Sequence, residues 1–461
     1  MHLIPVVPHA SPEEVTELAS ACWMMPLAVR IPGHSLAHLP SETANKLAEC
    51  EWTFLVGGWS EPILSSLPDS SRVLQIEREL GALRNLGVRN FAGYVDSGWE
   101  QPLATLFVEA GLPKVFLSWS PPFPIAPIVT DHLGAVVTII PIGSPIAPVV
   151  DDPATVPAGS SPLGKVLSQQ AAKRDQPLTD RSWAEALDAD PEAALLHRKM
   201  LRLASRTKKG TPPEALEWLL AAQSGSWFDV GVDRKAAHAA LVAARHRIDL
   251  ARRRPAGWQR TSKLDWDADG REEIQIENVW LSSVIDPDAG MISYVDHKPS
   301  ERSISYLPGE PPWHLARGLV GDQPTRLTFG SFELAEDRGR TVVTIAGSGL
   351  ELTVTVIEST VSFAYRLHPS FPFERIGPEL PLMADRKVVR LKVDGGDWID
   401  VAQPLAHSGH RFRLDAGTYR IVIALEQPGD LFLRPAPGGM VAWPNWPALS
   451  GEYRLTLEIV A

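Results

Sequence analysis

Short apolar runs alternate with stretches of helical spacing in the N-terminal third of the chain. The runs at 52–56, 91–95 and 115–118 predict strands, and residues 71–86 and 103–110 predict the helices that follow two of them. This alternation is typical of βαβ units, so we expect a parallel sheet.

Prolines dominate residues 121–162, where we expect one strand at 135–140 and long loops. Beyond them, alanine, leucine, arginine and glutamate recur at helical spacing and predict helices at about 182–208, 212–223 and 233–253. Helices of this kind, joined by short connections, are expected to form a small antiparallel bundle.

After residue 254 the helical pattern stops, and apolar residues alternate with polar ones to the end of the chain. The strands expected there are 273–280, 341–345, 350–357, 360–367, 387–393, 417–425 and 453–459. Gly, Pro, Asp and Asn residues separate them, as in an antiparallel β-sandwich. We therefore expect a parallel β/α domain at 1–165, a helical bundle at 166–256 and a β-sandwich at 257–461.

The net charge of the chain limits the kinds of molecule that it is expected to bind. The 461 residues carry 55 acidic and 44 basic side chains, a net charge of −11. A nucleic-acid ligand would need clustered Lys and Arg, so we expect no nucleic-acid partner. The 15 tryptophans suit stacking on sugars, although core and interdomain packing is the more common role of such large rings.

The cysteines and the apolar runs indicate the compartment. Cys22 and Cys50 are the only cysteines, too few for a disulfide framework, which indicates a reducing environment. The first residues lack the pattern of a secretory signal, and the prolines at positions 5 and 8 would break a signal helix. No run of about 18 apolar residues occurs. We expect a soluble, cytoplasmic protein with no membrane partner.

Most of the candidate catalytic and substrate-binding residues lie in two motifs at predicted strand ends. The first is Gly-Gly-Trp-Ser-Glu-Pro-Ile-Leu at 57–64, and the second is Gly-Tyr-Val-Asp-Ser-Gly-Trp-Glu at 93–100. Both resemble segments of glycoside hydrolase family 57, in its branch of α-amylases and 4-α-glucanotransferases. In that family the catalytic strand holds the nucleophilic glutamate three residues before a Trp-Glu pair.

Further matches follow in the same order along the chain. Segments at 183–201, 219–227 and 265–296 resemble the helical region of the family and the start of its C-terminal sandwich. The resemblance covers roughly three quarters of the chain. It implies an incomplete TIM-like parallel β/α barrel, then the small helical bundle, then the C-terminal antiparallel β-sandwich, with any site at the carboxyl ends of the barrel strands.

The chain departs from the family pattern where the chemistry lies. Asp96 stands at the position of the nucleophilic glutamate. The N-terminal His-Asn-His-Gln-Pro strand of the family is reduced to His9, which follows a proline. The family's Asp-Asp-Gly-Glu segment, which holds the second carboxylate, is largely absent at 148–183, where Asp151 and Asp152 form the only acidic pair.

Retaining cleavage or transfer of an α-glucan needs a carboxylate nucleophile and a protonated acid about 5–5.5 Å away. By the resemblance, Asp96 is the candidate nucleophile and Asp152 a weak candidate acid. Aspartate is one methylene shorter than glutamate, and a displacement of about 1 Å can cost roughly 100-fold in rate. The candidate substrate-binding residues are Trp59, Glu61, Trp99, Glu100, Trp119 and Trp227.

Each candidate also has a structural interpretation. Asp96 could cap the helix after its strand, because acids at strand-to-helix turns are common for that reason alone. Asp151 and Asp152 could form a solvated Asx turn before a proline. The tryptophans could pack in the core.

One acidic motif is similar to a metal loop. Asp265, Asp267 and Asp269 with Gly270 match the first half of a calcium loop, but Ile276 occupies the twelfth position, where a bidentate glutamate is needed. The histidines show no zinc spacing. We expect an acidic turn here, with no metal and no other cofactor.

Three functions remain open. The first is an α-1,4-glucan-associated protein of family 57 type with impaired catalysis, a binder or regulatory partner in carbohydrate metabolism. The second is an active retaining 4-α-glucanotransferase or α-amylase with Asp96 as nucleophile, and the third is a noncatalytic scaffold without a sugar ligand. The expected ligand is an α-glucan or maltooligosaccharide, and a protein partner could complete the opened barrel.

Overall fold

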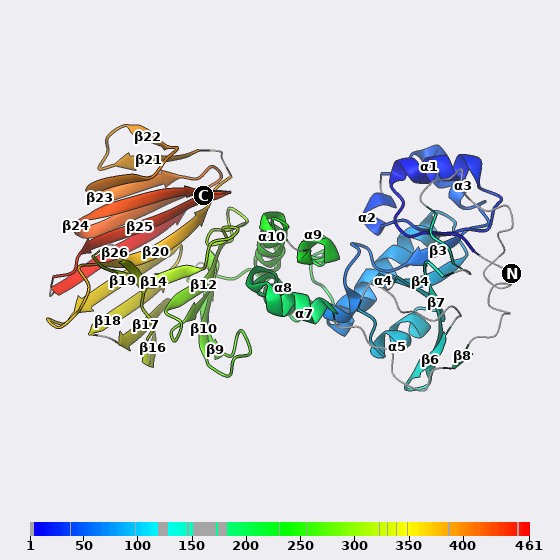
Figure 1. Cartoon of the computed structure of the whole chain (residues 1–461), viewed down its shortest axis with the longest axis horizontal. Coiled ribbons are helices and arrows are strands. Elements are labelled where there is room, and N and C mark those ends of the chain that lie inside the picture. Colours follow the sequence, from blue (N-terminus) through cyan, green and yellow to red (C-terminus); the bar gives the residue numbers. More distant parts are fainter. Residues whose placement is uncertain are drawn as a thin grey trace. The chain divides into compact units, whose positions relative to one another are not determined.

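The computed structural model describes residues 4–36, 38–96, 98–118, 128–144, 147–150, 172–173, 182–229, 231–255, 257–321, 323–329, 331–337, 339–347, 349–385, 388–449 and 451–461. The chain forms two compact units (Figure 1). The first comprises Met1–Thr207 and Leu219–Val232, and the second comprises Lys208–Trp218 and Asp233–Ala461. The three-part division at 1–165, 166–256 and 257–461 remains a prediction.

An eight-stranded sheet organises the first unit, in the order β1-β2-β3-β4-β5-β7-β6-β8. Neighbours from β1 through β5 to β7 run parallel, as expected. Val149 forms a parallel bridge with Val6 of β1. The strands are β1 (Val6–Val7), β2 (Ala28–Arg30), β3 (Thr53–Val56), β4 (Phe91–Val95), β5 (Lys114–Leu117), β6 (Ile128–His132), β7 (Ala135–Pro141) and β8 (Ala172–Lys173).

Apolar side chains pack on both faces of this sheet. A small cluster collects residues from β1 to β5 and β7 and from the segments beside them: Ile4, Val6, Ala28, Leu55, Ala92, Tyr94, Phe116, Ile140 and Ala147. A larger cluster joins the sheet to the helices. Because so many parallel strands share one small cluster, the sheet curves around it, which fits a TIM-like α/β fold.

The helices of the first unit begin where the local sequence favours it. At the start of α1, Ser11 and Glu14 form a reciprocal capping box, with the Glu14 N–H donating to Ser11 Oγ at 3.2 Å. The helix predicted at 71–86 is found as α4. The helices that precede α10 in the chain are α1 (Pro12–Ala21), α2 (Gly33–Leu36), α3 (Ser41–Leu47), the 3₁₀ turn η1 (Leu64–Ser66), α4 (Asp69–Asn85), α5 (Pro102–Glu109), α7 (Ser182–Ala189), α8 (Pro191–Ala204), α9 (Pro213–Ala222) and the 3₁₀ turn η3 (Gly225–Phe228).

Two predictions in the middle of the chain were wrong. The single helix expected at 182–208 is two helices, because Asp190 caps a new helix through the N–H groups of Glu192 and Ala193 and Pro191 cannot continue the old one. The proline-rich stretch contains the antiparallel pair β6–β7 where one strand was expected.

A continuous antiparallel sheet forms most of the second unit, which we call the C-terminal sheet. Its ladders run in the order β9-β10-β11-β12-β14-β20-β25-β24-β26-β19-β18-β17-β16, and β24 also pairs with β23. Thr261 of β9 meets Thr341 of β17 through their hydroxyls at 2.6 Å. The sheet is therefore nearly barrel-shaped.

Its strands follow helix α10 (Lys235–Ala251): β9 (Gln259–Leu264), β10 (Glu273–Asn278), β11 (Leu281–Asp286), β12 (Met291–His297), β13 (Arg302–Ser303), β14 (Trp313–Val320), β15 (Gln323–Arg326), β16 (Ser331–Asp337), β17 (Arg340–Gly347), β18 (Leu350–Ile357), β19 (Thr360–Leu367), β20 (Arg375–Met383), β21 (Val389–Val393), β22 (Trp398–Val401), β23 (Leu405–Asp415), β24 (Arg420–Ala436), β25 (Gly439–Pro447) and β26 (Gly451–Val460). All seven strands expected here have a counterpart. Others, such as β11 and β20, were not predicted.

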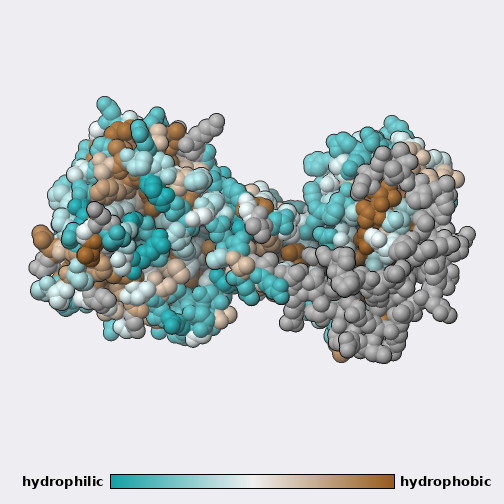
Figure 2. All heavy atoms as spheres, in the orientation of Figure 1, coloured by the Kyte–Doolittle hydropathy of each residue, from teal (hydrophilic) through white to brown (hydrophobic). Residues whose placement is uncertain are grey.

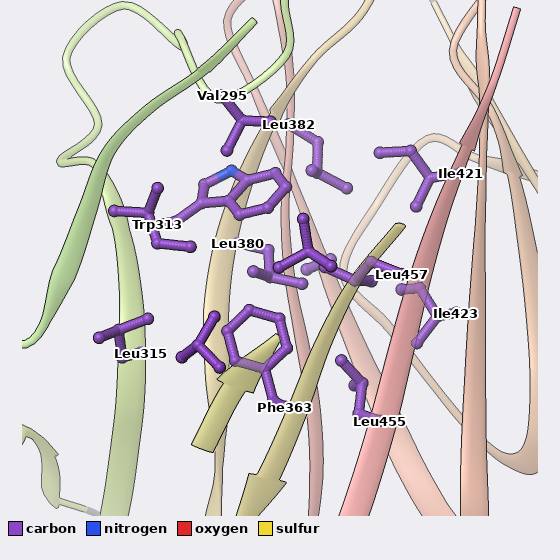
Figure 3. Packing of buried hydrophobic residues seen from close by; sticks show 14 of the residues in the cluster. Val295, Trp313, Leu315, Phe363, Leu380, Leu382, Ile421, Ile423, Leu455 and Leu457 are labelled. Atoms are coloured by element: carbon purple, nitrogen blue, oxygen red, sulfur yellow. The ribbon is translucent and has the colours of Figure 1, made fainter. Parts of the chain in front are cut away.

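The core of the second unit lies inside this folded sheet. Side chains from distant strands, such as Trp313 and Leu457, point into one shared apolar interior (Figure 3). On the outside, hydrophilic residues cover much of the visible face of the C-terminal sheet, interrupted by apolar patches (Figure 2). None of the helices in the described part of the chain is long and apolar enough to cross a membrane.

Candidate functional site

A buried ion pair holds the backbone at the carboxyl end of β3. Glu79 of α4 accepts hydrogen bonds from the N–H groups of Gly57 at 3.0 Å and Gly58 at 2.7 Å. Its other oxygen pairs with Arg30 at the end of β2, and Arg30 Nη2 donates to the Gly58 carbonyl at 2.8 Å. A Cβ at Gly58, whose φ is +113°, would lie 2.7 Å from Pro62 Cδ. The turn therefore needs glycine.

The burial and the hydrogen bonds of Arg30 and Glu79 give this ion pair a structural role. Arg30 and Glu79 are 1% and 0% exposed. Burial raises the pKa of Glu79 to about 7, although the Arg30 guanidinium and the two glycine N–H groups favour the ionised carboxylate. Both of its oxygens are occupied by protein donors, so Glu79 positions the loop and does not face a ligand.

The loop places Glu61 in a fixed, unusual conformation. Its φ is +53°, in the left-handed region that disfavours side chains with a Cβ. The Glu61 N–H donates to the Gly58 carbonyl at 3.2 Å, and the Gly225 N–H donates to the Glu61 carbonyl at 2.9 Å. Backbone contacts on both sides thus set the direction of the Glu61 side chain.

His9, just beyond β1, joins two carboxylates from other strands. Its Nδ1 lies 2.9 Å from Glu61 Oε1, and its Nε2 lies 3.3 Å from the Tyr94 hydroxyl and 4.0 Å from Asp96 Oδ1. The hydrogen bond to Glu61 raises the pKa of His9 above its usual value and lowers the pKa of Glu61. We call His9, Glu61, Tyr94 and Asp96 the strand-end cluster.

Tyr94 and Asp96 complete the cluster from β4. The Tyr94 hydroxyl donates to Asp96 Oδ1 at 3.1 Å, and burial raises the pKa of that hydroxyl. The Asp96 side chain is 59% exposed. Helix α5 begins at Pro102 with Gln101 before it, so Asp96 is not the cap of this helix.

The remaining predicted site residues lie in different surroundings. Trp59 is half-buried, and the Arg78 guanidinium lies 4.6 Å from its ring centroid. Glu100 is also half-buried, 4.0 Å from Arg72. Trp227 is half-buried as well, and its indole N–H donates to a backbone carbonyl of α9 at 2.9 Å.

Trp99 has the structural role that the sequence left open as its alternative. It is fully buried in the core between the sheet and the helices, and its ring stacks on Phe107 with centroids 6.5 Å apart. In this position its faces are covered by protein. Trp119, Asp151 and Asp152 lie outside the described residues.

Three residues that shape the site were not singled out by sequence reasoning, namely Arg30, Tyr94 and Glu79. Glu79 did leave a signal: it shares the buried face of α4 with Ile76 and Leu80, and a carboxylate on an apolar helix face needs a partner. The identity of that partner, Arg30, follows only from the packing of β2 beside β3.

The acidic motif of the second unit forms a turn. Asp265 accepts the Gly270 N–H at 3.2 Å, and Asp267 accepts the Asp269 N–H at 3.2 Å. Among the described residues these three aspartates are the one group placed closely enough to hold a metal. Exposed acidic groups are often this close without an ion, so the motif by itself gives no argument for a cofactor.

Comparisons with known proteins support the fold. No family profile matches the chain, and no curated protein is detectably similar in sequence. Among solved structures, a 4-α-glucanotransferase from Thermococcus litoralis superposes with a TM-score of 0.74 at 14% identity, covering 100% of this chain and 99% of that one.

Two other structures are much less similar. An α-mannosidase from Enterococcus faecalis V583 gives a TM-score of 0.39 at 9% identity, over 100% of this chain and 87% of that one. A galactose mutarotase-like protein from Lactobacillus casei ATCC 334 gives 0.30 at 12% identity, over 41% of this chain and 99% of that one. The chain therefore shares its fold with the Thermococcus enzyme, and at this level of identity the likeness concerns the fold alone.

Proposed function

We propose that this chain binds an α-1,4-glucan, in the form of a maltooligosaccharide, at the strand-end cluster, and that it does so as a binder or regulatory partner in cytoplasmic carbohydrate metabolism. The observation that carries the proposal is the single imidazole of His9 set between the carboxylates of Glu61 and Asp96. These groups lie at the carboxyl ends of parallel strands, where TIM-like folds place their ligands.

The chemistry of the cluster suits a sugar. Carboxylate oxygens accept hydrogen bonds from hydroxyls, and an imidazole can donate or accept, so the cluster can bind neighbouring hydroxyls of one pyranose ring. The side chains of His9 and Asp96 are 49% and 59% exposed and therefore accessible. The fold shared with a 4-α-glucanotransferase and the family 57 resemblance of the motifs support an α-glucan as the ligand.

Among the residues that the structure describes, which do not include the candidate acid Asp152, the protonation state of Glu61 favours binding without efficient catalysis. Retaining cleavage requires a protonated acid beside the nucleophile. His9 lowers the pKa of Glu61, which keeps this carboxylate ionised at neutral pH. Glu79, whose pKa of about 7 would suit an acid, is fully buried and bonded to Arg30 and two backbone N–H groups.

Titration calorimetry with maltoheptaose, followed by chromatography of the sugar, tests the proposal. We expect saturable binding that Glu61→Gln weakens about tenfold, as the loss of one charged hydrogen-bonding partner would, with the sugar recovered intact. Glu42→Gln, on the exposed face of α3, is the matched control and should bind as wild type does. Absence of binding in the wild type would leave the scaffold function.

A second candidate is an active retaining 4-α-glucanotransferase or α-amylase with Asp96 as nucleophile. It is favoured by the exposure of Asp96 and by the Tyr94 hydroxyl that orients it. New oligosaccharides formed by the wild type and lost in Asp96→Asn would establish this enzyme and overturn the noncatalytic proposal. A protein partner that completes the barrel and supplies the acid would show as activity only in its presence.

A further inference from the structure

A cleft of about 450 Å³ opens on the outer face of the C-terminal sheet, within the usual size range of small-ligand sites. Ala406, Phe432 and Trp443 lie directly opposite one another on β23, β24 and β25 and form part of its lining. Arg317 and Arg434 lie at its edges. We call this the Phe432 cleft. It belongs to the second unit and is separate from the strand-end cluster in sequence and in fold.

The floor of the Phe432 cleft is aromatic and partly open to solvent. Phe432 is 40% exposed, and its ring centroid lies 5.7 Å from that of Trp443. Cross-strand aromatic pairs commonly stabilise sheets, and this alone would explain the contact. Packing does not explain a concave lining that leaves a large ring partly exposed.

The indole N–H of Trp443 is a donor without an acceptor. Trp443 is 8% exposed, and its Nε1 is buried with no hydrogen-bond partner among the residues that the structure describes. A buried N–H in this state costs free energy, which an acceptor on a bound molecule would recover. The ring lines the Phe432 cleft, and the Arg317 guanidinium lies 4.8 Å from its centroid.

The charges around the Phe432 cleft are already paired within the protein. Arg317 Nη1 donates to Glu379 at 2.6 Å. Arg434 Nη2 contacts both oxygens of Glu310, at 2.8 and 2.9 Å. Both guanidiniums are already bonded to carboxylates, although Arg317 shares Glu379 with Arg326. The rim therefore suits a neutral ligand that accepts and donates hydrogen bonds.

We propose that the Phe432 cleft is a second carbohydrate-binding site, which takes a neutral oligosaccharide. The C–H face of a pyranose ring would stack on Phe432, while its hydroxyls reach the paired arginines and carboxylates of the rim and, after a small shift of the indole ring, the Trp443 N–H. That the oligosaccharide is an α-glucan rests on the proposed function.

The test uses the full chain carrying His9→Ala and Glu61→Gln, so that the strand-end cluster is disabled, and measures maltoheptaose binding by calorimetry. We expect residual binding that Phe432→Ala weakens about three- to tenfold and Trp443→Phe weakens by a similar factor. Trp398→Ala is the matched control. This tryptophan is 36% exposed and has the Arg390 guanidinium over its ring, so its surroundings resemble those of the cleft aromatics. It lies on β22 outside the Phe432 cleft, and its replacement should leave the affinity for maltoheptaose unchanged.

The outcomes separate the two proposals. Loss of all binding in the His9→Ala, Glu61→Gln chain, or equal affinities for the Phe432→Ala and Trp398→Ala variants, would overturn the Phe432 cleft as a site. Wild-type binding that responds to Phe432→Ala and not to the strand-end substitutions would uphold the cleft and overturn the proposed function at the strand-end cluster. Circular dichroism and melting temperatures confirm that each variant is folded.

Discussion

The substitution Glu79→Ala should be among the most damaging single changes in the first unit. It leaves Arg30, 1% exposed, as a buried cation without its partner, and it removes the acceptor of two backbone N–H groups. Breaking a buried pair in this way costs about 3–5 kcal/mol. The orphaned N–H groups place the expected loss toward the upper end of that range.

The assay must report on the first unit by itself, because two compact units need not unfold together. Hydrogen exchange of peptides from β2, β3 and α4 across a urea series gives the local free energy of unfolding. The affinity for maltoheptaose should fall together with this local stability, because the same ion pair holds the backbone of the loop that carries Glu61. Glu42→Ala, which removes an exposed carboxylate of the same unit, should leave the urea profile unchanged.

A double variant separates a buried unpaired charge from simple loss of packing. Replacing both partners, as Arg30→Met with Glu79→Leu, should recover part of the lost stability, because no buried charge is left unpaired, although the Gly57 and Gly58 N–H groups still lack their acceptor. The ion pair does not hold the loop if the free energy of unfolding of Glu79→Ala is within about 0.5 kcal/mol of the wild-type value, or if the double variant is no more stable than Glu79→Ala.

Three further changes follow from the same geometry. Glu61→Gly should be about 1 kcal/mol more stable than Glu61→Ala in urea unfolding, because only glycine accepts φ +53° without strain; equal stabilities would contradict the strain. Since the pKa of His9 is raised, the stability it contributes is complete below its usual value of 6.5 and is lost as pH rises through the raised value, so the melting-temperature advantage of wild type over His9→Gln should shrink as the pH rises above 6.5. Gly33→Ala should lower the free energy of unfolding by about 1–3 kcal/mol, because its Cβ would lie 2.9 Å from the Trp59 Cα. Gly81→Ala, in open space on α4, should instead raise it by about 0.5–1 kcal/mol. If Gly33→Ala were the more stable of the two variants, the close contact between Gly33 and Trp59 would be refuted.

The sequence was most informative where side-chain spacing reflects a single buried face. The strands β3, β4, β5 and β7 and the helix α4 were predicted within a few residues, because apolar spacing marks the face that packs on the sheet, whereas the short strands β1 and β2 were not predicted. The pattern failed for β11, where every position is buried, since Arg245 of α10 donates to Ser282 on what would otherwise be the exposed face. A strand covered on both sides has no alternation to recognise.

That the strand-end cluster is a ligand site stays a prediction, and the sequence indicated only some of its members. Motif spacing placed Glu61 and Asp96 at strand ends, and the structure joins them through His9. Which acid keeps its charge depends on contacts between residues far apart in the chain, such as the 52-residue separation of His9 and Glu61. Trp99 shows the reverse case, because a motif match cannot distinguish a ring that lines a cleft from one packed in the core.

The backbone contact between Gly225 and Glu61 has a consequence for how the protein is made. The same late segment supplies Gln223, whose amide oxygen accepts from Gln75 at 2.9 Å, 148 residues earlier. On the ribosome, the parallel sheet emerges well before this segment, so the loop that holds Glu61 can reach its final form only after residue 225 has left the tunnel. A nascent chain arrested after Thr207 would contain all four residues of the strand-end cluster. It would lack Gly225, whose N–H donates to the Glu61 carbonyl.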